Sequence, residues 1–366
     1  MMTDAAMTDT TEIHSDLPIP PGEYLAEVLT EYGMSQTVLA QRMDRPTQAI
    51  NEIIQGRKAI THETALQLAQ VLEVPAEIWL GLEMEYQLAR ARRAEEASLD
   101  NEADLLTELP YAAMAKLGWV PKVRQAREKV RCLRRFFGVS TLAAVSGVRA
   151  YECAFRRADA PASQYALAAW LRQGEIEART LDTAPFDKAK LRAALPALRP
   201  LTREHPERFV PELTALLAAC GVAFVTVPHL PKTYAQGAVF WLGDRAVLQL
   251  SIRGSYADIF WFSLFHELGH LLRHGKRTIL EGQGEDDDEY RRMEGEADEF
   301  ARNALLPGDD YAQFVQRGTF DKDSLLAFAE RQGIAVGIVV GRLQREKYLT
   351  YQQHHSLRER YTWTEE

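Results

Sequence analysis

The chain has 366 residues, a formal net charge of −9 and three cysteines. Its length predicts two or three domains, and its negative charge favours solubility without indicating a fold. The odd set of cysteines has no metal-ligand spacing, which is typical of a reducing compartment, and no apolar stretch is long enough to span a bilayer. We therefore expect a cytoplasmic multidomain protein without membrane association.

Residues 1–17 are polar and have neither a basic region nor an apolar core, so we expect a disordered tail rather than a signal peptide. An all-α domain is predicted over residues 18–93. Five helices are expected in it: one that opens at Pro21, one capped by Ser35, and three over residues 46–54, 64–72 and 76–93.

The second and third of these helices are joined by a tight turn, and the third is rich in exposed amides and hydroxyls. This pattern is typical of a helix-turn-helix, whose second helix enters the major groove of DNA. Thr47, Gln48 and Asn51 are the candidates for contacts with base edges. Arg57 and Lys58, which follow the helix, are the candidates for phosphate contacts.

The same region resembles the HigA branch of the Xre helix-turn-helix family, through GEYL at 22–25, MSQ at 34–36, IIQGRKAIT at 53–61 and IWL at 78–80. HigA proteins are antitoxins and autorepressors, so the resemblance implies operator DNA as a partner and a homodimer. The charge argues against DNA binding, because residues 18–89 hold four basic and ten acidic side chains. Protein–protein interaction is therefore the alternative role of this domain.

Residues 94–200 are rich in Ala and Leu and are predicted to form a mostly helical middle region. Within it, residues 116–157 carry eleven Lys and Arg against Glu128 and Glu152, a local net charge of +9. Three interpretations remain open: a solvated face that offsets the acidic N-terminal domain, an auxiliary contact with nucleic acid, and docking onto that acidic domain. Four prolines between residues 185 and 206 then mark the entry to another domain.

Three short strands are predicted at residues 222–227, 238–242 and 246–250. Gly243 and Asp244 between the last two predict a tight hairpin. An edge strand of this small sheet is expected to run beside the next helix, where it could bind an extended peptide by strand addition. That interpretation requires the edge to be free of other parts of the protein.

The next helix carries the most informative motif, HELGH at residues 266–270. His266 and His270, at i and i+4, lie on one helix face and can bind one metal ion. Glu267 between them can accept a proton from a water activated by that metal. The residues before the motif are almost wholly apolar, so the helix is expected to be buried and its polar groups to need partners.

Other residues of this helix have predicted structural roles. Ser255 and Asp258 are expected to form a capping box at its start. His274 is expected near its end, where a cation is favoured by the helix dipole. Gly269 costs about 1 kcal/mol relative to Ala in a helix, which predicts the close approach of another element.

A zinc site of this kind needs a third protein ligand and an open position for water. Residues 293–305 have their apolar side chains at the helical period and are followed by Pro307, which predicts a second helix. Glu294, at the edge of the apolar stripe, is the predicted third ligand. Asp298 lies one turn further and is predicted to hydrogen-bond a ligating histidine. Glu296, rotated by about 200°, is the alternative ligand.

The stretch FSLFHELGH at 262–270, with residues 294–301 and LLP at 305–307, resembles the ImmA/IrrE metallopeptidases over roughly residues 200–345. These are zincin-like proteases, often encoded beside or fused to helix-turn-helix regulators, and members with a known role cleave a repressor. The resemblance implies that His266, His270 and Glu294 bind zinc and that Glu267 is the general base. Asp298 replaces the Asn that is more usual there, although Asp is also found.

Together these observations predict a multidomain, mainly α protein. It would have a disordered tail (1–17), an all-α helix-turn-helix domain (18–93), a helical middle region (94–200), an α+β zincin-like metallopeptidase domain with a small sheet (201–350) and a C-terminal tail (351–366).

The predicted function is that of a zinc metalloendopeptidase coupled to DNA binding. It would act as a transcriptional, stress or toxin–antitoxin regulator by cleaving a regulatory protein, such as a repressor or a cognate toxin. The alternative is a non-catalytic HigA-like antitoxin or repressor whose metal domain is a sensor or a toxin-binding module. An oxyanion-stabilising residue is also expected, and Tyr256, Tyr290, Tyr311 and His229 are the candidates.

Overall fold

The computed structural model describes residues 19–148, 161–231, 233, 235–252, 256–276, 279–280 and 288–362. Contacts divide the chain into two compact units, Met1–Asn101 and Glu102–Glu366, which are described separately. The expected tail at residues 1–17 lies outside the described residues. The domain limits expected at residues 93, 200 and 350 remain predictions.

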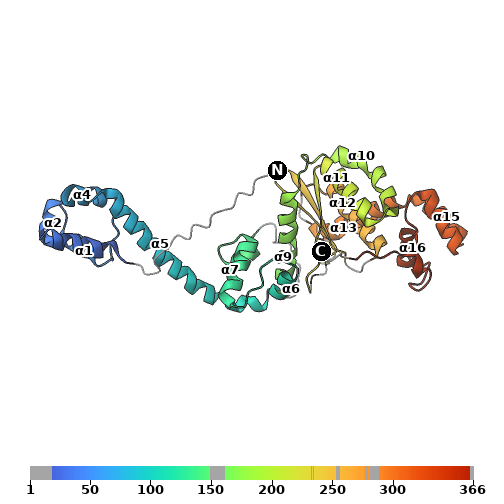
Figure 1. Cartoon of the computed structure of the whole chain (residues 1–366). Helices are drawn as coiled ribbons and strands as arrows, with labels where there is room; N and C mark the ends of the chain where they lie inside the picture. The colour runs from blue at the N-terminus through green and yellow to red at the C-terminus, as the bar shows by residue number, and fades with distance from the viewer. Residues whose placement is uncertain are drawn as a thin grey trace, which may run out of the picture. The chain divides into compact units, whose positions relative to one another are not determined.

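The first unit is all-α (Figure 1), with α1 Pro21–Glu31, α2 Gln36–Arg42, α3 Thr47–Ile54, α4 His62–Leu72 and α5 Ala76–Asn101. The predicted cap is confirmed, because the Ser35 hydroxyl accepts a hydrogen bond from the backbone N–H of Val38 at 3.3 Å. The last helix continues past its expected end near Arg93, since no Gly or Pro interrupts residues 82–101.

Apolar side chains from all five helices form the core of this unit. Gly22 at the start of α1 lies so close to the end of α3 that a Cβ atom would overlap the backbone of Ile53 and Ile54. The buried carboxylate of Glu83 accepts the backbone N–H of Ile60 at 2.9 Å. These contacts position the end of α3, the second helix of the helix-turn-helix, against α1 and hold the loop after it to α5.

The second unit combines helices with one small sheet. The helices that the structure describes in it are α6 Tyr111–Lys116, α7 Ala126–Phe137, α9 Pro161–Thr180, α10 Lys188–Leu198, α11 Pro206–Ala219, α12 Ala257–Arg273, α13 Asp288–Leu305, α14 Gly308–Arg317, α15 Lys322–Gln332 and α16 Val336–Arg345. Short 3-10 turns lie at Ala103–Thr107, Leu142–Gly147, Pro200–Arg203 and His355–Leu357. The mainly α fold with one small sheet agrees with the prediction.

The sheet has the strand order β1-β3-β2-β4, with β1 Val222–Thr226, β2 Gly237–Leu242, β3 Arg245–Leu250 and β4 Ile279–Leu280. β1 runs parallel to β3, and β2 is antiparallel to both β3 and β4. The predicted hairpin is confirmed, with Gly243 in the left-handed region at φ +61°.

Helices cover both faces of this sheet (Figure 1), which explains why its strands are buried almost continuously. Leu248 and Leu250 of β3 join the core formed with α12. On the opposite face, the amide of Gln249 donates a hydrogen bond to the backbone oxygen of Trp170 in α9 at 2.8 Å. Gly174 in α9 permits this packing, since a Cβ atom there would overlap the Gln249 side chain.

The strand beside α12 is not a free edge. β2 lies against α12, but Ala238 and Val239 pair with Leu280 and Ile279 of β4. The expectation that a substrate peptide adds to this edge is therefore wrong at residues 238–239, because the protein fills that position with its own strand.

The helical segment after residue 102 is fixed by a buried ion pair. Both carboxylate oxygens of Glu102 bind the Arg134 guanidinium, at 2.8 and 3.1 Å, and one also accepts the N–H of Leu142. The other basic residues described in this region with exposed side chains are Lys116, Lys122, Arg124, Arg127, Arg131 and Arg135. Arg149, Arg156 and Arg157 lie outside the described residues.

Among the described residues, no single helix is long and apolar enough to cross a membrane. Only α15 and α16 taken together meet that test, and they are bent by 114° at their junction.

Candidate metal centre

Helices α12 and α13 hold the predicted metal-binding residues. Their close approach depends on Gly269, as expected: a Cβ atom there would lie 3.0 Å from the Phe300 ring and 3.2 Å from Ala297 Cα. The predicted capping box is wrong for its described member. The N-cap is Tyr256, and the Asp258 carboxylate instead forms a bidentate pair with Arg358, at 2.8 and 3.0 Å. Ser255 lies outside the described residues.

The structure brings His266, His270 and Glu294 together, with one potential ligand atom from each within 4.8 Å of the others. The two imidazole Nε2 atoms are 2.9 Å apart. The Glu294 oxygens lie 3.3 Å from His266 Nε2 and 3.4 Å from His270 Nε2. Both histidines are buried, whereas the Glu294 side chain is 22% exposed, so the cluster borders solvent on the carboxylate side.

Each histidine is also held through its second ring nitrogen. His266 Nδ1 lies 3.0 Å from Asp298 Oδ1, which is the contact predicted for Asp298. His270 Nδ1 lies 2.9 Å from His274 Nδ1, and His274 Nε2 lies 3.1 Å from Glu296 Oε2. Glu296, the alternative ligand, therefore contacts His274 and not the cluster.

The polar partners decide where the imidazole protons lie. A carboxylate can only accept, so His266 donates from Nδ1 to Asp298 and His274 donates from Nε2 to Glu296. With one proton on each imidazole, His274 accepts at Nδ1 and His270 donates from its own Nδ1. Both Nε2 atoms of the cluster are left as lone pairs that face each other and a carboxylate, an arrangement that favours a bound cation.

The donor set fits zinc. Four ligands at Zn–N and Zn–O bonds of about 2.0–2.1 Å stand at the corners of a tetrahedron with edges of about 3.3 Å. The two His–Glu separations match that edge, and the His–His separation of 2.9 Å is slightly shorter. Three protein ligands leave the fourth position open, which is typical of catalytic rather than structural zinc.

The charges of the cluster suit metal binding near neutral pH. Burial by itself raises the pKa of the Glu294 carboxyl, but the hydrogen bonds and charge that His266 and His270 supply when they are protonated outweigh that effect and lower the pKa to about 2. Burial also lowers the pKa of His270 and keeps this imidazole neutral. A metal ion would therefore bind an ionised Glu294 carboxylate and would not have to displace a proton from His270.

Glu267, the predicted general base, is fully buried beside the first residue of β2. A Cβ atom on Gly237 would overlap Oε1 of Glu267, so only glycine allows the strand to come this close. Sequence reasoning missed this role of Gly237, because the contact depends on how β2 packs on α12.

Two of the four oxyanion candidates use their hydroxyls elsewhere. Tyr311 donates a hydrogen bond to Glu346 Oε2 at 2.8 Å, and the Tyr256 hydroxyl lies 2.7 Å from His355 Nε2. Tyr290 is buried in α13, and His229 lies in the segment after β1. The geometry singles out none of the four.

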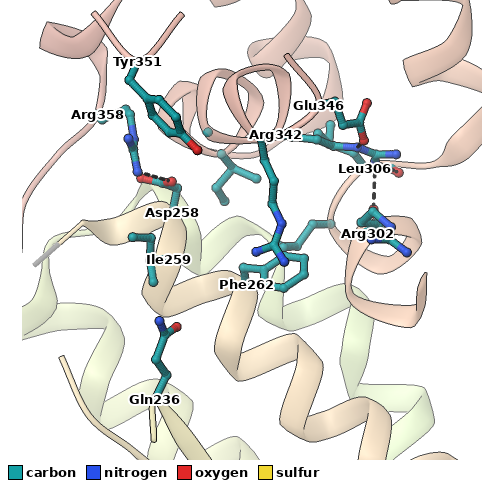
Figure 2. A pocket seen from close by; sticks show the side chains of 14 residues that line it. Gln236, Asp258, Ile259, Phe262, Arg302, Leu306, Arg342, Glu346, Tyr351 and Arg358 are labelled. Atoms are coloured by element: carbon teal, nitrogen blue, oxygen red, sulfur yellow. Dashed lines mark hydrogen bonds and ion pairs between the residues drawn. The ribbon is translucent and has the colours of Figure 1, made fainter. Parts of the chain in front are cut away.

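A cavity of about 320 Å³ is lined in part by Phe262, one helical turn before His266. Figure 2 shows the side chains that line it. Its walls come from the start of α12, the end of α13 and α16. Phe262, four residues before His266, forms part of the wall, and the two rings lie 6.3 Å apart. Gln236, next to the glycine that contacts Glu267, lies at another side.

In the first unit, the five candidate DNA-contacting residues are all exposed. Thr47, Gln48 and Asn51 lie on the outer face of α3, while Ala49, Ile50 and Ile53 face the core. Gln48 donates a hydrogen bond to Glu52 at 2.9 Å. Arg57 and Lys58 lie in the loop after α3, which Gly56 begins in the left-handed region at φ +66°.

Fold and site thus define two classes of domain in one chain: a helix-turn-helix and a zincin-like domain. Residues 25–79 match the helix-turn-helix family, and residues 246–344 match the Peptidase_M78 family, described as the IrrE N-terminal-like domain. The chain belongs to the helix-turn-helix family through its N-terminal part and contains an IrrE-like domain after it.

Individual relatives match the N-terminal part. Virulence-associated protein I of Dichelobacter nodosus is 36% identical over 76 residues, which cover 20% of this chain and 70% of that protein. The HTH-type transcriptional regulator YddM of Escherichia coli is 28% identical over 78 residues, which cover 21% of this chain and 83% of that protein. An addiction module antidote protein of the HigA family from Coxiella burnetii is a similar solved structure, with 36% identity, a TM-score of 0.22, and coverage of 23% of this chain and 94% of its own.

Proposed function

We propose that this protein is a zinc-dependent metalloendopeptidase coupled to a DNA-binding domain, and that it regulates transcription by cleaving a regulatory protein. The observation that carries the proposal is the cluster of His266, His270 and Glu294, with Glu267 on the same helix as both histidines. A purely structural or sensory metal site needs ligands but no neighbouring carboxylate base. The match of residues 246–344 to the Peptidase_M78 family supports the same chemistry.

In this proposal His266, His270 and Glu294 hold zinc, and Asp298 and His274 fix the orientation of the two imidazoles. Zinc would supply a Lewis acid that polarises the peptide carbonyl and lowers the pKa of water. Glu267 would take the proton from the attacking water and deliver it to the leaving amine. The burial of Glu267 beside Gly237 keeps this carboxylate in a fixed place and away from bulk water.

The Glu267→Gln variant tests this proposal, because it removes the base and keeps the shape. Zinc content, measured by atomic absorption on the purified full-length chain, should equal that of the wild type. New protein N-termini in cells that express the wild type should be absent from cells that express Glu267→Gln. Identical sets of N-termini in both cultures, with zinc bound in both proteins, would argue against a protease.

A second candidate function is a non-catalytic antitoxin or repressor whose metal domain senses a ligand or binds a toxin. The observation that favours it is that Glu267 has no exposed surface, so solvent does not reach the base in this conformation. The same pair of proteins separates the two functions. Equal repression of the chain's own promoter by wild type and Glu267→Gln, without cleavage by either, would favour the non-catalytic role.

For the N-terminal domain we propose operator DNA as the partner, bound by a homodimer. The exposed face of α3 and the match to the helix-turn-helix family support this proposal. Since residues 18–89 carry a net charge of −6, from four basic and ten acidic side chains, affinity would depend on two copies binding two half-sites. A cytoplasmic location is part of the proposal.

A further inference from the structure

The cavity beside the metal cluster has an apolar wall and a positively charged lining. Ile259, Phe262, Leu305, Leu306 and Ile338 contribute its apolar surface. Four arginines and two acidic residues make up the charged part of the lining and give it a formal net charge of +2: Arg302, Arg342, Arg345, Arg358, Asp258 and Glu346. A cavity of this kind attracts a ligand that is both aliphatic and anionic.

Two of the arginines are satisfied by the protein itself (Figure 2). Arg358 forms the bidentate pair with Asp258 at one side of the cavity. On the opposite side, Arg342 donates to Glu346 at 3.0 Å and to two backbone carbonyls at 3.2 Å. These contacts fix both guanidinium groups as parts of the wall.

Arg302 and Arg345, unlike the other two arginines, both approach the same carboxylate oxygen, Asp298 Oδ2. Their guanidinium nitrogens lie 3.6 and 3.8 Å from Asp298 Oδ2, which is longer than a hydrogen bond. Neither guanidinium donates a hydrogen bond to any residue that the structure describes, and Arg345 lies over the Phe262 ring at 5.3 Å. Both guanidinium groups therefore line the cavity with N–H donors that no described residue accepts.

We propose that this cavity is a specificity pocket that binds an acidic side chain of the protein substrate next to the bond that is cleaved. The aliphatic part of the side chain would lie on Ile259 and Phe262, and its carboxylate would accept hydrogen bonds from Arg345 and Arg302. Phe262 in the wall lies one helical turn before His266, with ring centroids 6.3 Å apart, so a side chain in the pocket would belong to a residue near a peptide bond at the metal. The inference rests on the proposed protease function for its biological meaning, but the pocket can be tested by binding alone.

The test uses the full-length, zinc-loaded Glu267→Gln protein, which binds peptide without cutting it. Two fluorescent pools of short peptides, acetylated and amidated, differ only in one fixed position, which is Glu in one pool and Gln in the other. Fluorescence polarisation should give a Kd about tenfold lower for the Glu pool, as charge-assisted hydrogen bonds predict. In the Arg345→Gln and Arg302→Gln backgrounds this preference should fall to about twofold or less.

A matched control removes a positive charge elsewhere. Arg317→Gln, on the exposed end of α14, should keep the full preference for Glu. Equal Kd values for the Glu and Gln pools in the unsubstituted background would overturn the proposal, and so would equal loss of preference in Arg317→Gln. A third pool with Gln and a free C-terminal carboxylate separates the two sources of a carboxylate, and tighter binding of that pool than of the Glu pool would refute the side-chain assignment. Failure of the wild type to cleave any peptide would refute the protease and leave these binding results standing.

Discussion

The hydrogen bond between His266 and Asp298 gives the most direct test of the metal centre. Asp298 Oδ1 lies 3.0 Å from His266 Nδ1, and this contact leaves Nε2 as the atom that would bind the proposed metal. Asp298→Ala removes it, whereas Asp298→Asn keeps an acceptor oxygen of the same shape without the charge. We expect both proteins to fold, because the Asp298 side chain is 28% exposed and is not part of the core.

The size of the effect follows from the type of contact. Loss of a residue that orients a metal ligand typically reduces metal affinity about 10–100-fold, which corresponds to about 1.4–2.7 kcal/mol. We expect Asp298→Ala to lie in that range. Asp298→Asn should weaken zinc binding by about threefold or less, because its amide oxygen still accepts the His266 proton.

Competition for zinc with a fluorescent chelator at pH 7.5 measures these affinities in the full-length protein. Glu296→Ala provides a parallel case, since it removes the acceptor behind His274 and so acts on His270 through one further residue. Its effect should be smaller than that of Asp298→Ala. Wild-type zinc affinity in Asp298→Ala, or equal weakening by Ala and Asn, would refute the assignment of protons in this cluster.

The remaining predictions concern stability, pH and DNA. Glu83→Ala should lower the free energy of unfolding by about 1–3 kcal/mol in urea titrations, because the buried N–H of Ile60 loses its acceptor; an unchanged midpoint would contradict this. The lowered pKa of His270 means that the unfolded chain binds more protons below its ordinary value of 6.5, so the metal-free protein should lose stability as pH falls from 8 to 5.5. That loss should be smaller in His270→Gln, and equal slopes would count against it. Asn51→Ala should weaken operator binding by about 1–3 kcal/mol in mobility-shift titrations without changing the melting temperature, since its side chain is exposed; unchanged affinity would remove Asn51 from the interface.

Local rules of sequence were sufficient for much of the site. The i, i+4 spacing alone placed His266 and His270 on one face of α12. The apolar stripe of α13 then pointed to Glu294 and Asp298, and the structure brings both to the histidines. The side chains lie together because helix periodicity fixes which of them share a face, whatever the helix packs against.

Other features could not be predicted from local sequence, because they depend on how elements far apart in the chain pack together. The expected capping role of Asp258 was wrong, because Arg358, one hundred residues later, pairs with its carboxylate. His274 was expected only to be favoured by the helix dipole near the end of α12. In the structure it connects His270 to Glu296 of α13. The free edge expected beside α12 was also wrong at residues 238–239, since the two-residue strand β4 that pairs there carries too short a pattern to be predicted.

The sequence by itself determined the helix-turn-helix, the zincin-like helix and three candidate ligands, because each depends on residues within one or two turns of a helix. Only the tertiary structure decided what surrounds them: glycine at 237 against Glu267, the second ring contacts of both histidines, and two arginines that share one oxygen of Asp298. Those contacts join α12 to β2, α13 and α16. Their geometry depends on how the helices and the sheet pack around one core, and no local periodicity encodes it.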